Sequence, residues 1–319
     1  MKVVVATHGH CFDGLASAAV FSRLHREVRG SASYTYRACG YGTGQSPPLE
    51  QLLAGDENAI LDFRFAASSR LTWYFDHHRT AFATEADRAR FLEPPQADRY
   101  FFDPEYSSCT KLVRDVGRSQ FDWHAPDLDD LVHWADIIDA ARFESAEDAI
   151  SRRDPIKRLV NVVEYYGDDA FLERMVPELT TRPLVEVASS SFVEERYRPL
   201  GKKYDRFVER VRQKGEQRGR VVFVDLTETV LETVGKFVTY ALFPDSVYSV
   251  IVGVLRSGAK ISVGYNPWSG QPLDTDISAI CARHGGGGHP VVGGISLRLT
   301  EVDRAREIAL QIVRELADG

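Results

Sequence analysis

The sequence predicts an α/β protein in which a doubly wound, mostly parallel sheet is joined by linker helices to a second, smaller α/β domain. Strand-like apolar runs alternate with segments of helical periodicity over about the first half of the chain, as in parallel sheets that helices cover on both faces. Between residues 151 and 218 the pattern changes to long, strongly charged helical segments. The length of 319 residues also exceeds the usual size of a single core, which favours two domains.

The elements of the first domain follow from the apolar periodicity. A strand is expected at residues 2–7, and a helix at 14–29, where Leu15, Ala18 and Leu24 recur at helical spacing. Further strands are expected at 33–37, 59–63 and 71–75, and further helices at 109–116 and 128–139.

The second domain is expected to begin after the charged segments. Strands are predicted at 221–226, 246–255 and 260–265, followed by a glycine-rich run at 285–288 and a helix at 301–316. We therefore divide the chain into a first domain at 1–185, linker helices at 186–218 and a C-terminal domain at 219–319.

Composition and charge limit the possible partners. The 44% of hydrophobic and 27% of charged residues are those of an ordinary globular protein. A net charge of −7 argues against wrapping long double-stranded nucleic acid, because such binding needs many Lys and Arg contacts to phosphate. A locally positive pocket for a short nucleotide is compatible with this charge.

The expected location is the cytoplasm, without a membrane partner. The apolar run at the N-terminus is too short for a signal peptide, and no later stretch is long enough to span a bilayer. Four cysteines, which are expected to be reduced, lack the spacing of a zinc motif: Cys11, Cys39, Cys109 and Cys281. The sequence leaves the formation of a homodimer open.

The run from Trp73 to His78 is the strongest functional signal. Its three aromatic residues favour a buried strand, and Asp76, His77 and His78 follow at the strand's end. Polar side chains at the carboxyl end of a parallel strand usually line the crevice where such sheets bind ligands. The alternative is a solvated turn with two histidines.

Further residues that bind metals occur at the ends of other elements. His8, His10 and Asp13 follow the first strand, Asp62 interrupts an apolar run, and Asp136 interrupts the apolar side of a helix. Taken singly, each has another explanation. His8 and His10 could belong to a polar loop, Asp62 could be a hydrogen-bonded acid in the core, and Asp136 could lie on a polar edge of its helix. Together they would converge on one crevice of a parallel sheet.

Mixed histidine and aspartate ligands indicate the kind of metal. They favour Mn²⁺, with iron, cobalt and zinc as alternatives, whereas Mg²⁺ prefers an all-oxygen shell. Two such ions about 3.5–4 Å apart stabilise the attacking and leaving oxygens in phosphoester hydrolysis.

The chain resembles the DHH phosphoesterase family with its associated C-terminal domain. Within that family it resembles the branch of nanoRNases and phosphoadenosine phosphate phosphatases. Asp76-His77-His78 matches the motif that names the family, and the other motifs follow in the family's order over nearly the whole chain. They are Asp13-Gly14-Leu15-Ala16-Ser17, Asp62, Ala135-Asp136, Asp276-Ile277-Ser278 and the run Gly285-Gly286-Gly287-Gly288-His289.

The resemblance implies a role for each matching residue. Residues 1–185 would be the catalytic domain, in which Asp62 bridges two divalent ions and one of these ions is bound by His77, Asp13 and Asp136. His78 would face the scissile phosphate, and Asp76 would orient an imidazole from behind.

The first motif departs from the family pattern, because only Asp13 is acidic and His8 and His10 stand where other ligands are expected. Either histidine or both could bind the second ion, or that ion is weakly held. We hypothesise that both bind it, which would favour iron, cobalt or zinc over magnesium.

The C-terminal domain is expected to bind substrate through the backbone of Gly286, Gly287 and Gly288 and through His289 and Arg283. A flexible glycine hinge is the alternative. Relatives often place an arginine just after the strand 260–263, where this chain has none, and Arg256 or Lys260 is expected to compensate.

These observations predict a metal-dependent phosphoesterase for short nucleotides, whether nanoRNA, phosphoadenosine phosphate, or linear or cyclic dinucleotides. A single-strand-specific exonuclease and a catalytically impaired nucleotide-binding sensor are the alternatives.

Overall fold

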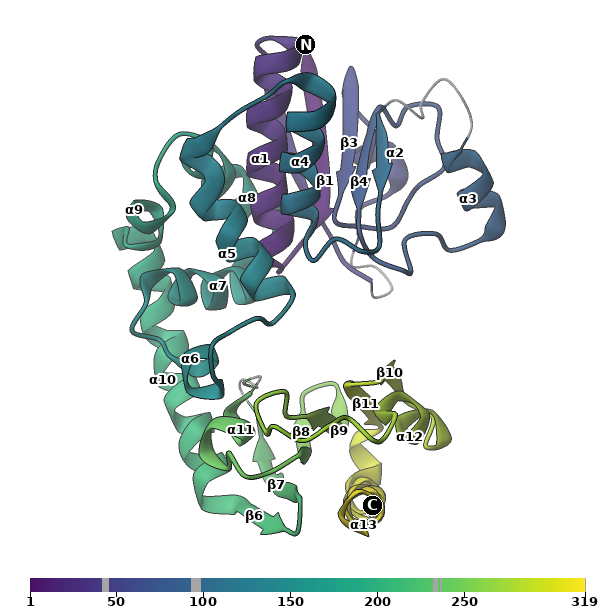
Figure 1. Cartoon of the computed structure of the whole chain (residues 1–319), viewed down its shortest axis with the longest axis vertical. Coiled ribbons are helices and arrows are strands. Elements are labelled where there is room, and N and C mark those ends of the chain that lie inside the picture. The colour runs from purple at the N-terminus through teal and green to yellow at the C-terminus, as the bar shows by residue number, and fades with distance from the viewer. Residues whose placement is uncertain (42–45, 93–98, 232–234, 236, 319) are drawn as a thin grey trace. The chain divides into compact units, whose positions relative to one another are not determined.

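The computed structural model describes residues 1–41, 46–92, 99–231, 235 and 237–318 (Figure 1). The chain forms two compact units and passes between them more than once. The first unit comprises Met1–Arg142 and Arg152–Tyr197, and the second comprises Phe143–Ser151 and Arg198–Gly319, whose final glycine lies outside the described residues.

The first unit is built on a parallel sheet with the strand order β2-β1-β3-β4-β5. The pairs between neighbouring strands in this order are parallel. The strands are β1 (Lys2–His8), β2 (Ser33–Cys39), β3 (Glu57–Leu61), β4 (Trp73–Asp76) and β5 (Tyr100–Phe102). Because β2 and β3 lie on opposite sides of β1, the strand order reverses between β1 and β3, which is where open α/β sheets bind ligands.

Burial explains why these strands have apolar sequences. Every residue of β3 and β4 is buried, as expected for a sheet with both faces covered. The core on one side of the sheet includes Ile60, Tyr74 and Tyr100. Strand β4 ends at Asp76, whose side chain is fully buried, so the aromatic run leads directly into the polar cluster predicted at its end.

Helices cover the sheet of the first unit (Figure 1). Helix α1 (Phe12–Arg29) buries Leu15, Ala18 and Leu24, and it ends at Gly30, which has a φ of 91°. The other helices are α2 (Leu49–Leu52), α3 (Glu85–Phe91), α4 (Cys109–Phe121), η2 (Pro126–Leu128), α5 (Asp129–Asp139), α7 (Pro155–Tyr166), α8 (Asp169–Leu179) and α9 (Leu184–Ala188).

The second unit contains a mixed sheet with the order β10-β11-β9-β8-β7-β6, in which β7 and β8 pair in parallel. Its strands are β6 (Gly215–Arg218), β7 (Val221–Val230), β8 (Tyr248–Leu255), β9 (Gly258–Tyr265), β10 (Gly287–His289) and β11 (Val292–Leu297). Its helices are α6 (Ala146–Ile150), α11 (Val238–Leu242), α12 (Ile277–Arg283), η3 (Leu299–Glu301) and α13 (Val302–Asp318).

Helix α10 (Ser191–Lys214) runs from the first unit into the second. In the second unit its Tyr204, Phe207 and Val211 pack against strand β7 in a shared core. The predicted class, a doubly wound sheet followed by a smaller α/β domain, is confirmed. Among the described residues, no helix combines the length and the apolar character needed to cross a membrane.

Candidate metal centre

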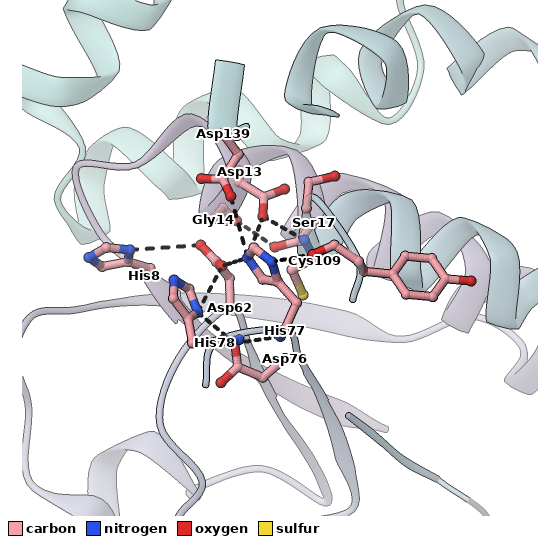
Figure 2. A network of polar contacts seen from close by, with 12 residues as sticks. His8, Asp13, Gly14, Ser17, Asp62, Asp76, His77, His78, Cys109 and Asp139 are labelled. Atoms are coloured by element: carbon pink, nitrogen blue, oxygen red, sulfur yellow. Dashed lines mark hydrogen bonds and ion pairs between the residues drawn. The ribbon is translucent and has the colours of Figure 1, made fainter. Parts of the chain in front are cut away.

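Acidic and imidazole side chains from several elements converge at the carboxyl end of the parallel sheet (Figure 2). His8 is the last residue of β1, Asp62 follows β3, and His77 follows β4. Asp13 lies in the first turn of α1, and Asp139 is the last residue of α5. The cluster thus occupies the edge of the sheet where the strand order reverses.

Asp62 is at the middle of this cluster. Its backbone has a φ of 54°, and its side chain is 1% exposed. Among the described residues, neither of its carboxylate oxygens has a hydrogen-bond partner. A buried carboxylate without hydrogen bonds is costly, so this environment fits a bound cation.

His77 points its Nε2 at three carboxylates. This atom is 3.4 Å from an oxygen of Asp139, 3.5 Å from Asp62 and 3.7 Å from Asp13. Its Nδ1 lies 3.0 Å from the carbonyl oxygen of Tyr106, to which it must donate, because a carbonyl only accepts. When the ring is neutral, Nε2 therefore carries the lone pair that a metal ion needs.

Asp13 is fixed by the N-terminus of α4. One of its oxygens accepts a hydrogen bond from the Cys109 amide at 2.6 Å, and the other accepts from the amide and hydroxyl of Thr110 at 3.0 and 2.5 Å. Gly14 lets the first turn of α1 approach β1, since an added Cβ would lie 2.1 Å from the His8 carbonyl oxygen. These contacts hold Asp13 beside His77.

Asp76 supports His78 from within the core. Its Oδ1 lies 2.7 Å from Nδ1 of His78 and accepts the His77 amide at 2.9 Å, while its Oδ2 accepts the Tyr74 hydroxyl at 3.0 Å. Both oxygens of Asp76 are occupied by these bonds. The carboxylate therefore orients the ring of His78.

The excess of carboxylates shifts the titration of the cluster. Burial lowers the pKa of His77, but the neighbouring Asp62 and Asp13 outweigh it and raise that pKa to about 10. Burial and the charge of Asp13 raise the pKa of Asp62 well above its usual range. For His78, burial alone would lower the pKa, but the hydrogen bond to Asp76 outweighs the effect of burial and the pKa is raised. The cluster thus favours positive charge at its centre.

Three groups of side chains have ligand atoms within 4.8 Å of one another: Asp13, His77 and Asp139; Asp62, His77 and His78; and His8, Cys11 and Asp62. The first two consist of oxygen and nitrogen donors, which suit Mn²⁺. The third adds a sulfur. Neither Asp139 nor Cys11 is among the ligands predicted from the sequence.

Two predicted ligands lie elsewhere. Asp136 accepts a hydrogen bond from Ser107 and pairs with Lys111 at 3.7 Å and Arg142 at 3.3 Å, and it belongs to none of the three groups found among the described residues. Asp139, about one turn later in the same helix, contacts His77 instead.

His10 is exposed, has a φ of 56° and belongs to none of the three groups found in the described part of the chain. Its amide donates to the carbonyl of Gly167 at 3.0 Å, and its side chain lines the same cleft as His8.

The predicted substrate residues of the second unit do not all gather in one place. Gly287, Gly288 and His289 form the exposed strand β10, which pairs with the beginning of β11. Arg256 lies in the turn between β8 and β9, at the end of β9 that pairs with the end of β11. The length of these strands therefore separates Arg256 from the glycine run.

The other predicted positions in this unit differ in their surroundings. Arg283 ends α12, where it pairs with Glu315. Gly288 has a φ of 152°, and an added Cβ would lie 2.2 Å from the Val292 carbonyl oxygen, so the backbone itself requires glycine there. At Gly287 an added Cβ would meet no described atom within 4 Å.

No family model and no curated protein matches the sequence. Among solved structures, the chain is similar to the pGpG-specific phosphodiesterase PggH of Vibrio cholerae, with a TM-score of 0.71, 18% identity, and coverage of 100% of this chain and 99% of that one. The second unit is thus included in the likeness.

A DHH domain from a protein described as belonging to a family of ribosomal proteins has a TM-score of 0.59 and 12% identity, covering 98% of this chain and 86% of that one. The chain has the DHH-type fold. RecJ of Thermus thermophilus in complex with Mn²⁺ has a TM-score of 0.56 and 10% identity, and the match covers 98% of this chain but only 52% of RecJ. The predicted resemblance is confirmed at the level of the fold.

Proposed function

We propose that the chain is a metal-dependent phosphoesterase that hydrolyses phosphodiester or phosphomonoester bonds of short nucleotides. The observation that carries this proposal is the buried carboxylate of Asp62, which faces nitrogens of His8, His77 and His78 at 3.5 to 3.7 Å. Structures of similar fold that were solved with Mn²⁺, both of RecJ, support the binding of a divalent metal by this chain.

The residues at the centre would have distinct tasks. Asp13, Asp62, His77 and Asp139 would hold one ion, and Asp62 and His8 would hold a second. When bound, the two ions would activate a water molecule and stabilise charge on the phosphoryl oxygens. Asp76 accepts from Nδ1 of His78, and the protonated ring of His78 would then donate from its Nε2 to the phosphoryl group of the substrate.

A cleft beside the centre could receive the nucleotide. It has a volume of about 1070 Å³, and its lining includes His8, Tyr41 and Gln51. Such a volume is at the upper end of the range for small-molecule sites. The Tyr41 ring lies 4.7 Å from that of Phe63 between centroids, and the Arg64 guanidinium lies over it at 4.7 Å, so an aromatic and a cationic group border the cleft.

A linear dinucleotide is the favoured substrate, because the full-length fold is shared with a pGpG-specific phosphodiesterase. For the second unit, we propose that Gly286, Gly287, Gly288 and His289 bind the anionic part of the substrate. Arg283 and Arg256 are weaker candidates, because Arg283 is paired with Glu315 and Arg256 lies at the other end of β9.

The test is a substrate panel assayed with Mn²⁺, comprising ribonucleotides of two to five residues, phosphoadenosine phosphate, cyclic dinucleotides and longer single strands. We expect turnover to be highest with a dinucleotide and to be abolished in His77→Ala. Processive digestion of long strands would favour an exonuclease instead. Tight binding of a dinucleotide without turnover under any metal would favour a sensor.

A further inference from the structure

We propose that Cys11 is a ligand of the second metal ion, together with His8 and Asp62, and that this ion is therefore Zn²⁺, Fe²⁺ or Co²⁺ in preference to Mn²⁺ or Mg²⁺. The proposal rests on the proposed function, in that the cluster binds metal. It assigns a sulfur donor that the sequence, read by zinc-motif spacing, did not indicate.

The position of Cys11 places its thiol at the cluster. Cys11 is the N-cap residue of α1, with extended backbone angles of φ −128° and ψ 134°. Its side chain makes no capping hydrogen bond within the described structure, so it does not do what an N-cap Ser, Thr, Asp or Asn does. Instead, its sulfur lies within 4.8 Å of ligand atoms of His8 and Asp62.

Asp62 is independent evidence that a cation belongs there. Its two oxygens have no hydrogen-bond partner among the described residues, and each lies near a different histidine. Oδ1 lies 3.5 Å from Nε2 of His77 and 3.7 Å from Nδ1 of His78, whereas Oδ2 lies 3.7 Å from Nδ1 of His8. One carboxylate could thus give an oxygen to each of two ions, and Cys11 would join His8 in holding the second.

The two sides differ in chemistry. On the side of His77, the other donors are the carboxylates of Asp13, Asp62 and Asp139, and this oxygen-rich set suits Mn²⁺ or Mg²⁺. On the side of His8, one imidazole, one thiolate and one carboxylate form a mixed set that suits Zn²⁺, Fe²⁺ or Co²⁺.

Binding requires the thiolate. As the bond between sulfur and metal forms, the Cys11 thiol releases its proton to solvent, and no electron is transferred.

The experiment uses the full chain, stripped of metal and titrated with Co²⁺, while absorption in the near ultraviolet reports a charge-transfer band from thiolate to cobalt. We expect the band in the wild type and its loss in Cys11→Ser and in Cys11→Ala. Cys109→Ser is the matched control, because the Cys109 sulfur is committed to the Phe75 carbonyl at 3.3 Å. His10→Ala is a second control, and both controls should keep the band.

Zinc affinity gives an independent measurement. In Cys11→Ser we expect the weaker-bound Zn²⁺ to lose at least about tenfold in affinity, since removing even an outer partner of a ligand commonly costs that much. Circular dichroism in EDTA checks that the variants fold. A wild type that binds two Co²⁺ without the band, or a band that persists in Cys11→Ala, would overturn the proposal.

Failure of the enzyme function can be distinguished from failure of this inference. If the cobalt band depends on Cys11 but no nucleotide is hydrolysed, the metal assignment stands and the proposed activity is wrong. If dinucleotides are hydrolysed and the band is absent with both cobalt sites filled, the activity stands and the sulfur ligand is wrong.

Discussion

Asp62 combines a left-handed backbone with a buried carboxylate, and both features reduce the stability of the chain without metal. Asparagine tolerates the same backbone conformation, so Asp62→Asn removes only the charge. In EDTA we expect this variant to be more stable than the wild type by about 1 to 3 kcal/mol, because burying the charge opposes folding.

With saturating Mn²⁺ the wild type should become more stable than Asp62→Asn. The wild type gains binding free energy, about 2.7 kcal/mol at one hundred times the Kd, and the variant gains little. Thermal unfolding with and without metal measures both effects. If Asp62→Asn were less stable than the wild type in EDTA, the idea that the Asp62 carboxylate lacks compensating partners would be wrong.

Asp139 and Asp136 provide a second comparison at the scale of residues. Asp139 contacts His77 at 3.4 Å, whereas Asp136 is held by Ser107, Lys111 and Arg142. We expect Asp139→Asn to lose about 10- to 100-fold or more in metal affinity and in kcat/KM, and Asp136→Asn to stay within a few-fold of wild type. Isothermal titration with Mn²⁺ decides between them, and the opposite order would restore Asp136 as the ligand.

The sequence could not decide between these two aspartates for a physical reason. They lie three residues apart on α5, and which carboxylate reaches the centre depends on where the helix ends, which patterns predict poorly. Cys11 was missed for a different reason. Spacing rules for metal cysteines describe local motifs, whereas the partners of Cys11 include Asp62, which only the fold brings close.

At the scale of elements, helix α4 has its N-terminus at the metal centre. Its first amides are satisfied by Asp13, a residue almost one hundred positions earlier in the chain. The sequence predicted the helix and the aspartate separately. Their pairing could not be predicted, because it depends on the side-by-side packing of α1 and α4 (Figure 1).

A second polar cluster joins β3, α1 and β4 away from the centre. Glu57 accepts from Trp73 at 2.7 Å and from Arg29 at 3.0 Å, and it lies 3.0 Å from Nε2 of His25. Burial raises the pKa of Glu57, but these three partners outweigh it and lower that pKa to about 2, from the usual 4.5.

This shift makes a prediction about acid stability. Because the folded pKa lies below the unfolded one, the charge of Glu57 stabilises the fold above pH 4.5, and this contribution is lost as the pH falls towards 2. We expect Glu57→Gln to lower the free energy of unfolding on the order of 3 kcal/mol near pH 7 and much less near pH 2 to 3. Urea unfolding across this range tests it.

The matched control is Glu50→Gln, since Glu50 is exposed on α2 and should change stability little at either pH. A constant difference between Glu57→Gln and wild type over the whole range would contradict the assigned pKa. Glu57 would then contribute to stability through its packing alone.

At the scale of the whole molecule, the alternation of strands and helices was sufficient to predict the fold class. It was insufficient to place residues 143–151, which interrupt the first unit and belong to the second. Phe143 explains the placement, because its carbonyl accepts from the Trp268 indole at 3.1 Å and its ring packs on Phe237 with centroids 6.1 Å apart. Such contacts between distant positions leave no periodic trace in a sequence.

The net charge of −7 leads to a prediction about substrate length. Binding to single strands weakens with salt in proportion to the phosphates neutralised, with a slope of about −0.7 for each. A protein that binds only a dinucleotide neutralises few phosphates, so a plot of log(1/KM) against log salt should be no steeper than about −2. An exonuclease with an extended basic channel would give a steeper slope that grows with strand length.

Measuring KM for a dinucleotide and a longer strand between low and high salt separates these cases. Equal, shallow slopes are expected here, because each strand would be bound only through the nucleotides next to the scissile bond. A slope that steepens with strand length would show that the acidic chain has a basic track after all, and it would move the proposed substrate from short nucleotides to polymeric single strands.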